Sequence, residues 1–440
     1  MKASFASAAR VSLGICFALT AVGCSRNILS SPEETANRTL FHKAALELPI
    51  AIAECKKEHA PLGLNDLDES IPADQNAASQ YEKVFAELDK LPPTLSRALF
   101  APDREFDPAK TEIALKDGAG VISDLRKAVA YPHCYFKPTE PEFIVPFRTT
   151  SSLKKAATII GLDARLQASK GNVAAAAMDM TSIFKIEKQM EEESAVVTDL
   201  VAVDIQKSAT LILEEIMEAC KANPSVAEAL WKVVNDSMPN LPTGPPFRVE
   251  ILPHYSNVPT YWNRKNLDAN NPALYRILDC TEGVSPNDIV AAFQTRALQF
   301  GLALFHAADD QSKTGEQKLE EFQEIGNEED SGDGTHCWMS FIGADFEEAL
   351  STIIKYSELR DCSLIGLKIM KDHKLGSPWP KSLPSGGPKE ELTGKPFNYK
   401  SSATGFEVYA ARIKKLPSNG VEVSFRYPAN YLVASSKKQF

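Results

Sequence analysis

The spacing of apolar residues predicts helices over most of the chain. In three amino-terminal segments, around 41–55, 77–88 and 121–129, apolar positions recur at i, i+3, i+4 and i+7, which places them on one face of an α-helix. Pro49 should bend the first of these helices. Asn76 suits the cap of the second, because its side chain can accept a hydrogen bond from the first turn.

Two adjacent stripes in the middle of the chain predict an antiparallel helical hairpin. One stripe runs from Leu153 to Ala168 and the next from Val173 to Phe184, with Gly171-Asn172 between them. Their many alanines allow the two backbones to approach closely. Further helices are expected at about 195–220, 226–238, 286–308 and 344–373, the third of them with Ser285 as its cap and Pro286 in its first position.

Between Pro239 and Cys280 the helical pattern stops. Seven prolines in this stretch argue against a long helix. The same stretch is rich in aromatic residues, which a disordered linker would lack. We therefore expect an ordered, extended excursion that packs on the helices.

Alternation of apolar and polar residues near the carboxy end predicts a small antiparallel sheet. Apolar residues occupy every second position from Val421 to Tyr427, and Phe406, Val408 and Ala410 suggest a partner strand. The residues expected inside, against the helix that ends near His373, are Phe397, Phe406, Val423 and Phe425. Because only one strand face is buried, Val423→Lys should destabilise the protein and Glu422→Lys should not.

The first 23 residues have the pattern of an export signal, with Lys2 and Arg10 before a short apolar stretch that ends near Val22. The sequence Ala21-Val22-Gly23-Cys24 resembles the lipobox of bacterial lipoproteins, which implies acylation of Cys24 and anchoring in a membrane. Ser25, which is not aspartate, implies sorting to the outer membrane by the same resemblance. Ala21 equally suits ordinary signal peptidase, so a secreted or periplasmic soluble protein is the alternative.

Together these patterns predict a mainly α protein: a helical-hairpin array with a proline-rich excursion and a small C-terminal antiparallel β-sheet. The expected divisions are a signal peptide at 1–23, a lipidated tether at 24–39, a helical domain at 40–238, the proline- and aromatic-rich excursion at 239–284, further long helices at 285–375 and the β module at 376–440.

Cysteine usage fits an oxidising compartment. Besides Cys16 in the signal and Cys24, six cysteines are candidates for disulfides: Cys55, Cys134, Cys220, Cys280, Cys337 and Cys362. An even number is left only if Cys24 is acylated. Of the possible pairings we expect Cys55 with Cys134, since both lie in the amino-terminal third; the alternative is that the six are buried reduced thiols.

The charge balance argues against a nucleic-acid partner. Removing Lys2 and Arg10 from the 48 basic residues leaves 46 against 58 acidic ones, a formal charge of −12. Binding to phosphates requires a clustered basic face. After the signal, no stretch reaches eighteen uninterrupted apolar residues, so no second membrane segment is expected.

Motifs for catalysis, cofactors or metals are not found. The chain has no H-E-x-x-H, C-x-x-C or G-x-S-x-G sequence. The glycines at 118–120 and 394 are better explained by turns than by phosphate loops, and the acidic segment 328–334 by a solvated loop than by a calcium site. The seven histidines are scattered, so we expect no catalytic residues, cofactor or metal.

One group of side chains is a candidate partner surface, because aromatic residues and arginine dominate protein interfaces. This group consists of Phe247, Tyr255, Tyr261, Trp262 and Arg264. The alternative is that the rings cover the helical core, as large aromatics usually do.

Two local resemblances bear on function. Residues 162–176, with small side chains around Gly171-Asn172, look like the turn of a tetratricopeptide-type helical pair, which implies a scaffold or peptide-binding surface. Residues 344–411 resemble a carboxy-terminal module of uncharacterised bacterial envelope lipoproteins and, more distantly, the soluble ends of pseudopilins. The expected function is therefore a non-catalytic envelope lipoprotein that binds or scaffolds a protein partner. The alternative is a hydrolase-like envelope enzyme whose site combines dispersed acidic and histidine residues.

Overall fold

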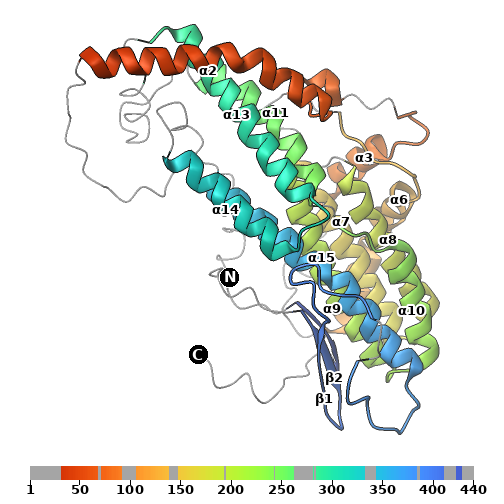
Figure 1. Ribbon diagram of the computed structural model, residues 1–440. Helices are drawn as coiled ribbons and strands as arrows, with labels where there is room; N and C mark the ends of the chain where they lie inside the picture. The colour runs from red at the N-terminus through yellow and green to blue at the C-terminus, as the bar shows by residue number, and fades with distance from the viewer. Residues whose placement is uncertain are drawn as a thin grey trace, which may run out of the picture.

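The computed structural model describes residues 31–67, 71–91, 106–137, 147–192, 195–241, 243–261, 281, 284–331, 343–383, 387–410 and 423–428. Within these ranges the chain forms twelve α-helices, a 3-10 helix (η2, Leu64–Leu67) and three strands. The fold is therefore mainly α with a small antiparallel sheet, as the apolar spacing predicts (Figure 1).

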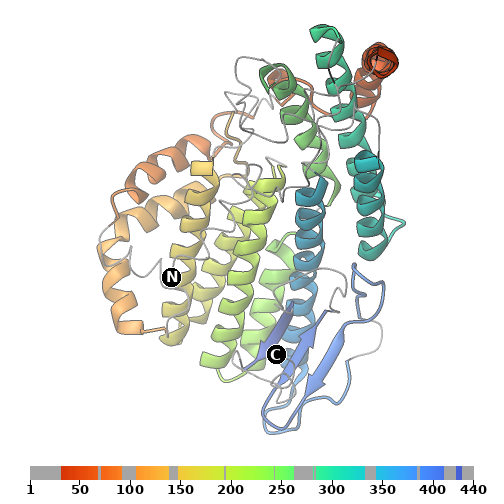
Figure 2. The same ribbon diagram turned by 90° about the vertical axis from the view of Figure 1, so that its left-hand side faces the viewer.

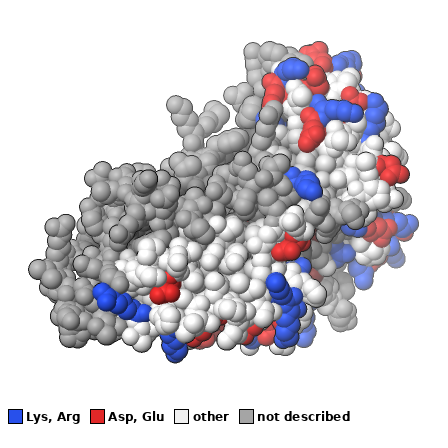
Figure 3. Space-filling view, turned by 90° about the horizontal axis from the view of Figure 1, so that it is seen from above, with Lys and Arg blue, Asp and Glu red and all other residues white. Residues whose placement is uncertain are grey.

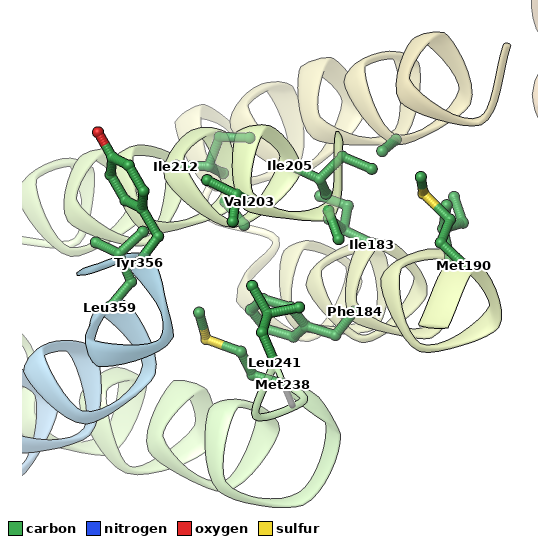
Figure 4. Packing of buried hydrophobic residues seen from close by; sticks show 14 of the residues in the cluster. Ile183, Phe184, Met190, Val203, Ile205, Ile212, Met238, Leu241, Tyr356 and Leu359 are labelled. Carbon is green, nitrogen blue, oxygen red and sulfur yellow. The ribbon is translucent and has the colours of Figure 1, made fainter. Parts of the chain in front are cut away.

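A bundle of long helices forms the body of the molecule. Its members are α7 (Phe147–Ser169), α8 (Val173–Glu191), α9 (Val196–Ala219), α10 (Pro224–Ser237) and α15 (Gly343–Asp372). Helix α9 packs against α7, α8 and α15, and α10 packs against α8 and α15. Apolar side chains from α8, α9 and α15 meet in its interior, with Met238 and Leu241 from the segment after α10 (Figure 4). Removing this apolar surface from water stabilises the bundle.

The predicted helical hairpin is confirmed as α7 and α8. Gly171 has a φ of +76°, a left-handed conformation that glycine adopts without steric penalty. The backbone N–H groups of Gly171 and Asn172 donate to the carbonyls of Ala168 and Gln167, at 2.9 and 2.8 Å, and so complete the end of α7.

Three shorter helices cover one side of this hairpin: α3 (Ala78–Leu88), α5 (Pro108–Asp117) and α6 (Ala119–Val129). The Asn76 side chain accepts from the backbone N–H groups of Ala78 and Tyr135, which joins the start of α3 to the 131–137 segment. Helix α5 was not predicted; Asp107 caps it and Pro108 occupies its first position.

The remaining helices extend the body toward one end. They are α11 (Gly244–Tyr261), α13 (Pro286–Asp309) and α14 (Gly315–Ser331), with α2 (Ser31–Lys57) lying across that end on α13 (Figures 1 and 2). The Ser285 side chain accepts from Asp288 N at 3.1 Å, as expected of the cap. Thr295 Oγ1 donates to Ala44 O at 2.9 Å and joins α13 to α2.

Two sequence predictions for this region were wrong. The stretch 31–39 of the expected tether belongs to α2, and part of the expected extended excursion forms the 18-residue helix α11 despite its prolines. Pro245 and Pro246 fall in the first turn of α11, where a backbone N–H has no partner in the helix. Further along, burial of Ile251 and Leu252, both 0 % exposed, offsets the hydrogen bond that an internal proline removes.

The sheet lies at the opposite end from α2 and has the order β1-β2-β3. Its strands are β1 (Asn398–Ser401), β2 (Phe406–Tyr409) and β3 (Ser424–Tyr427), all antiparallel to their neighbours. The four residues predicted to lie inside are all buried: Phe397, Phe406, Val423 and Phe425. Strands β2 and β3 pack on α15, as expected.

Val423→Lys is expected to lower the free energy of unfolding by about 2–4 kcal/mol, because a lysine would replace a side chain that is only 2 % exposed. Ser424→Lys changes the neighbouring, partly exposed position and should have little effect. Glu422, the control suggested by the sequence pattern, lies outside the described residues. Urea unfolding of the two variants measures the difference, and equal losses would contradict the face assignment.

Candidate functional site

Four carboxyl groups gather where α8 ends, α9 begins and α11 passes beside them. Glu187 and Glu191 lie one turn apart on α8, Asp199 lies in the first turn of α9, and Glu250 lies on α11. Glu187 and Asp199 are 0 % and 1 % exposed, whereas Glu191 and Glu250 are partly buried. We call these four residues the acidic cluster.

Burial shifts the proton affinity of every member of the acidic cluster. It raises the pKa of Glu191 to about 8 and that of Glu250 to about 7. The pKa values of Glu187 and Asp199 are raised well above the ordinary range, first by burial and then by the negative charge of Glu191. A low-dielectric setting and like charges both disfavour the ionised form, so the cluster holds protons at neutral pH.

Glu250 connects the acidic cluster to the start of α9. Glu250 Oε1 accepts from Val196 N, the first residue of α9, at 3.1 Å. Gln206 lies beside Glu187 but donates through Nε2 to the carbonyl of Pro239 at 3.1 Å. Within the described residues, Asp199 Oδ2 is buried and has no hydrogen-bond partner. Such a group destabilises the fold more when charged than when protonated.

The end of α8 also holds the segment that follows α6. Gln189 accepts from the Tyr81 hydroxyl at 2.8 Å and donates to the carbonyl of Tyr131 at 2.9 Å. Glu192 contacts His133 Nδ1 at 3.1 Å and accepts from Cys134 N at 2.8 Å. His133 therefore pairs with Glu192, the residue directly after Glu191 of the acidic cluster.

Two ion pairs between an exposed arginine and buried carboxylates connect elements of the body. Arg126 on α6 donates to Asp163 on α7 at 2.5 Å and to Asp179 on α8 at 2.8 Å. Burial, opposed by Arg126, raises the pKa of Asp179 to about 6. Arg126 therefore joins three helices through two carboxylates.

The sheet is fixed to the bundle in a similar way. Glu214 on α9 accepts from Arg426 N at 2.6 Å, and Arg426 Nε donates to Glu407 at 2.6 Å. On α15, Glu358 accepts from Leu392 N at 2.9 Å. These contacts satisfy the backbone donors of Arg426 on the edge strand β3 and of Leu392 in the turn before β1, so the buried carboxyls of Glu214 and Glu358 have structural partners.

Lys318 is a buried lysine, 1 % exposed, on α14. Its Nζ donates to Thr243 Oγ1 at 3.1 Å and lies 3.9 Å from Glu391 Oε1. Thr243 Oγ1 in turn donates to the carbonyl of Ala308 at 2.7 Å. These successive contacts connect α14 to the residue before α11 and to the end of α13.

The structure describes two of the five side chains of the candidate aromatic surface. Phe247 is 2 % exposed and packs edge-on against Phe322 and Phe346, so it belongs to the core, which was the stated alternative. Tyr255 is partly buried and packs beside Cys55 and Ile251. The side chain of Tyr261 and all of Trp262 and Arg264 lie outside the described residues.

The predicted Cys55–Cys134 disulfide does not form. Cys55 is a free thiol packed with Ala51, Ile251 and Leu302, and burial raises its pKa to about 12. Cys134 belongs to a different cluster, around Tyr81 and Leu125. Of the other candidates, Cys220 ends α9 and Cys362 is buried in α15, while Cys280 and Cys337 lie outside the described residues.

The described part of the chain contains neither a candidate metal site nor a candidate membrane-spanning helix. There, no three His, Cys, Asp or Glu side chains converge in a way that could hold a metal ion. No described helix has the length and apolarity needed to cross a bilayer. The acidic segment at 328–334 begins inside α14, which continues to Ser331.

Comparison of the chain with protein families, with curated proteins and with solved structures found no match. Function therefore has to be argued from the chain's own geometry.

The acidic cluster was not predicted from the sequence, although the position of Glu187 indicates a buried carboxyl group. Glu187 continues the apolar stripe of Met180, Ile183 and Phe184 at helical spacing, so its position alone places a carboxyl group in the core. A carboxyl on the buried face of a helix is rare and warrants attention. Asp199 and Glu250 gave no comparable signal, because their partners come from other helices.

Proposed function

We propose that the protein is a lipid-anchored envelope protein whose helical body serves as a non-catalytic scaffold for another envelope protein. The observation that supports this most is the arrangement of the body relative to α2. This helix begins at Ser31, with only six residues between it and the proposed anchor Cys24, and lies across one end of the molecule. The bundle extends away from α2, with the sheet at the far end.

An anchor at the α2 end would hold the bundle and the sheet away from the membrane, where a partner can reach them. The α7–α8 hairpin exposes an apolar side chain there, since Met178 on α8 is 71 % exposed. Methionine is enriched in the contact regions of protein interfaces. The outer side of α8 is therefore the first place to look for a bound protein.

Photo-crosslinking in the native host tests the scaffold role. A photoreactive residue at Met178 should give one discrete adduct with another envelope protein, identifiable by mass spectrometry. The same residue at Asp236, an exposed position on α10, serves as the matched control. Equal, diffuse adduct patterns at the two positions would argue against a partner on α8.

Lipid attachment at Cys24 is expected to add the mass of a diacylglyceryl group to the mature protein, which would then begin at residue 24. Intact mass spectrometry of protein extracted from the outer membrane measures this. Cys24→Ala should release the protein from the membrane fraction. An unmodified amino-terminal cysteine, or a Cys24→Ala protein that stays in that fraction, would contradict the anchor.

The acidic cluster favours a second candidate function, an envelope hydrolase. A general acid requires a carboxyl group that is protonated near neutral pH, and Glu191 and Glu250 are partly exposed groups with pKa values of about 8 and 7. Assays of the purified protein with ester, glycoside and peptide substrates test this. Turnover that is lost in Glu191→Gln would establish the enzyme, whereas turnover unchanged in that variant would exclude Glu191 as its general acid.

A further inference from the structure

Helix α2 has two different apolar faces. One face carries Phe41, Ala44, Ala51 and Cys55, which are all buried against α13 and α11. At 100° per residue, Leu46 and Ile50 project from the opposite side of the helix. They are 65 % and 61 % exposed, although they are large aliphatic side chains.

Most of the fully exposed charged residues of α2 are basic, although the exposed Glu54 lies one turn from Ile50 and the partly exposed Glu47 lies beside Leu46. Arg38, Lys43, Lys56 and Lys57 are exposed on α2, against a single exposed acidic residue, Glu54, among the described side chains of this helix. The mature chain as a whole has a formal charge of −12, so this basic surface runs against the overall balance. Figure 3 looks down on this end of the molecule and shows uncharged areas with both basic and acidic residues among them.

The position of α2 relative to Cys24 limits what can cover this surface. Residues 25–30 are the only chain between the proposed lipid and Ser31. Six residues span roughly 20 Å when fully extended, so an acylated Cys24 would keep α2 close to the headgroups. A helix with exposed aliphatic residues among lysines is suited to lie in the interfacial plane, where the aliphatic groups enter the acyl boundary and the lysines meet phosphates.

We propose that the outer face of α2, defined by Arg38, Lys43, Leu46, Ile50 and Lys57, lies against an anionic phospholipid surface. This inference rests on the proposed lipid anchor for its orientation. The face adds an electrostatic and an apolar contact to those of the lipid anchor. It also fixes the direction in which the bundle points away from the membrane.

Vesicle binding by unlipidated protein tests the α2 face separately from the anchor. The chain comprising residues 25–440 is mixed with vesicles of phosphatidylglycerol and phosphatidylethanolamine, or of phosphatidylcholine alone, and bound protein is separated by flotation. Binding to the anionic vesicles should be about tenfold tighter than to the neutral ones and should weaken in high salt.

Two pairs of substitutions test the aliphatic and the basic residues in turn. Leu46→Glu/Ile50→Glu and Lys43→Gln/Lys57→Gln should each weaken binding to anionic vesicles by about tenfold. Met178→Glu changes an equally exposed apolar residue on α8 and should leave binding unchanged. Thermal melting of each variant verifies that it is folded.

Each outcome has a definite meaning for the proposal. Equal affinity of the parent and the α2 variants for anionic vesicles would overturn it. A dimer in vesicle-free solution that Leu46→Glu/Ile50→Glu dissociates would assign the face to a second copy of the chain and would also overturn it. If residues 25–440 bind anionic vesicles but the intact mass of the mature protein shows an unmodified Cys24, the lipid anchor alone is refuted. If Cys24 is lipidated but residues 25–440 do not bind anionic vesicles, the α2 face alone is refuted.

Discussion

The free energy of unfolding is expected to fall by about 3 kcal/mol as the pH rises from 5 to 8, on the order expected for several carboxyls with raised pKa values. Burial raises the pKa of Glu191 to about 8 and of Glu250 to about 7, so the folded state binds protons that the unfolded state has released. The stabilisation is complete below the unfolded pKa, near 4.5, and is lost as the pH rises through 7 to 8. Glu358, with a pKa raised by burial to about 8, changes stability in the same direction.

Thermal melting at a series of pH values measures this loss. For a chain of this length, 3 kcal/mol corresponds to a change of about 4 °C in the melting temperature. Glu191→Gln replaces the protonated carboxyl with a neutral group of similar shape, so it should raise the melting temperature at pH 8 and leave it unchanged at pH 5. Glu82→Gln, at an exposed position on α3, is the control. A melting temperature that is constant or higher at pH 8 would contradict the assignment of protonated carboxyls to the core.

The helices that the sequence predicted best are those whose apolar stripe has a single buried side. The α7–α8 hairpin is an example: its spacing, its alanines and the Gly171-Asn172 turn all indicate the same structure, and local and global preferences agree. Strand β3 was equally predictable because alternation identifies which face is buried.

The sequence predictions that were wrong concern places where tertiary packing overrides local preference. The prolines of α11 argued against a helix, but α11 packs along α13 and its apolar side chains are buried there. The Cys55–Cys134 pairing failed because sequence separation gives no information about which cluster each thiol joins. The acidic cluster could not be assembled from sequence, since its four carboxyls come from three helices whose packing the pattern leaves open.

The contact between α15 and the sheet is tight at one point. Gly366 on α15 faces the ring of Phe425 on β3, and a Cβ atom at Gly366 would lie 2.1 Å from Phe425 Cδ1. Phe425 is fully buried and stacks on Phe406, and the centroid of the Phe406 ring lies 5.0 Å from that of Trp379. The absence of a side chain at Gly366 is thus what allows the Phe425 ring to lie against the helix.

Phe425→Ala is expected to lower the free energy of unfolding by about 3–5 kcal/mol, because it removes a fully buried ring and leaves a cavity. Gly366→Ala should lower it by about 1–3 kcal/mol, because the new methyl group clashes with that ring. The double variant decides whether the two residues act through the same contact. Without the ring, the methyl group at position 366 no longer clashes and fills part of the cavity, so the double variant should be less destabilised than the sum of the single ones by at least about 1 kcal/mol. Urea unfolding of the four proteins measures this coupling, and strictly additive losses would show that β3 does not pack on α15 at Gly366.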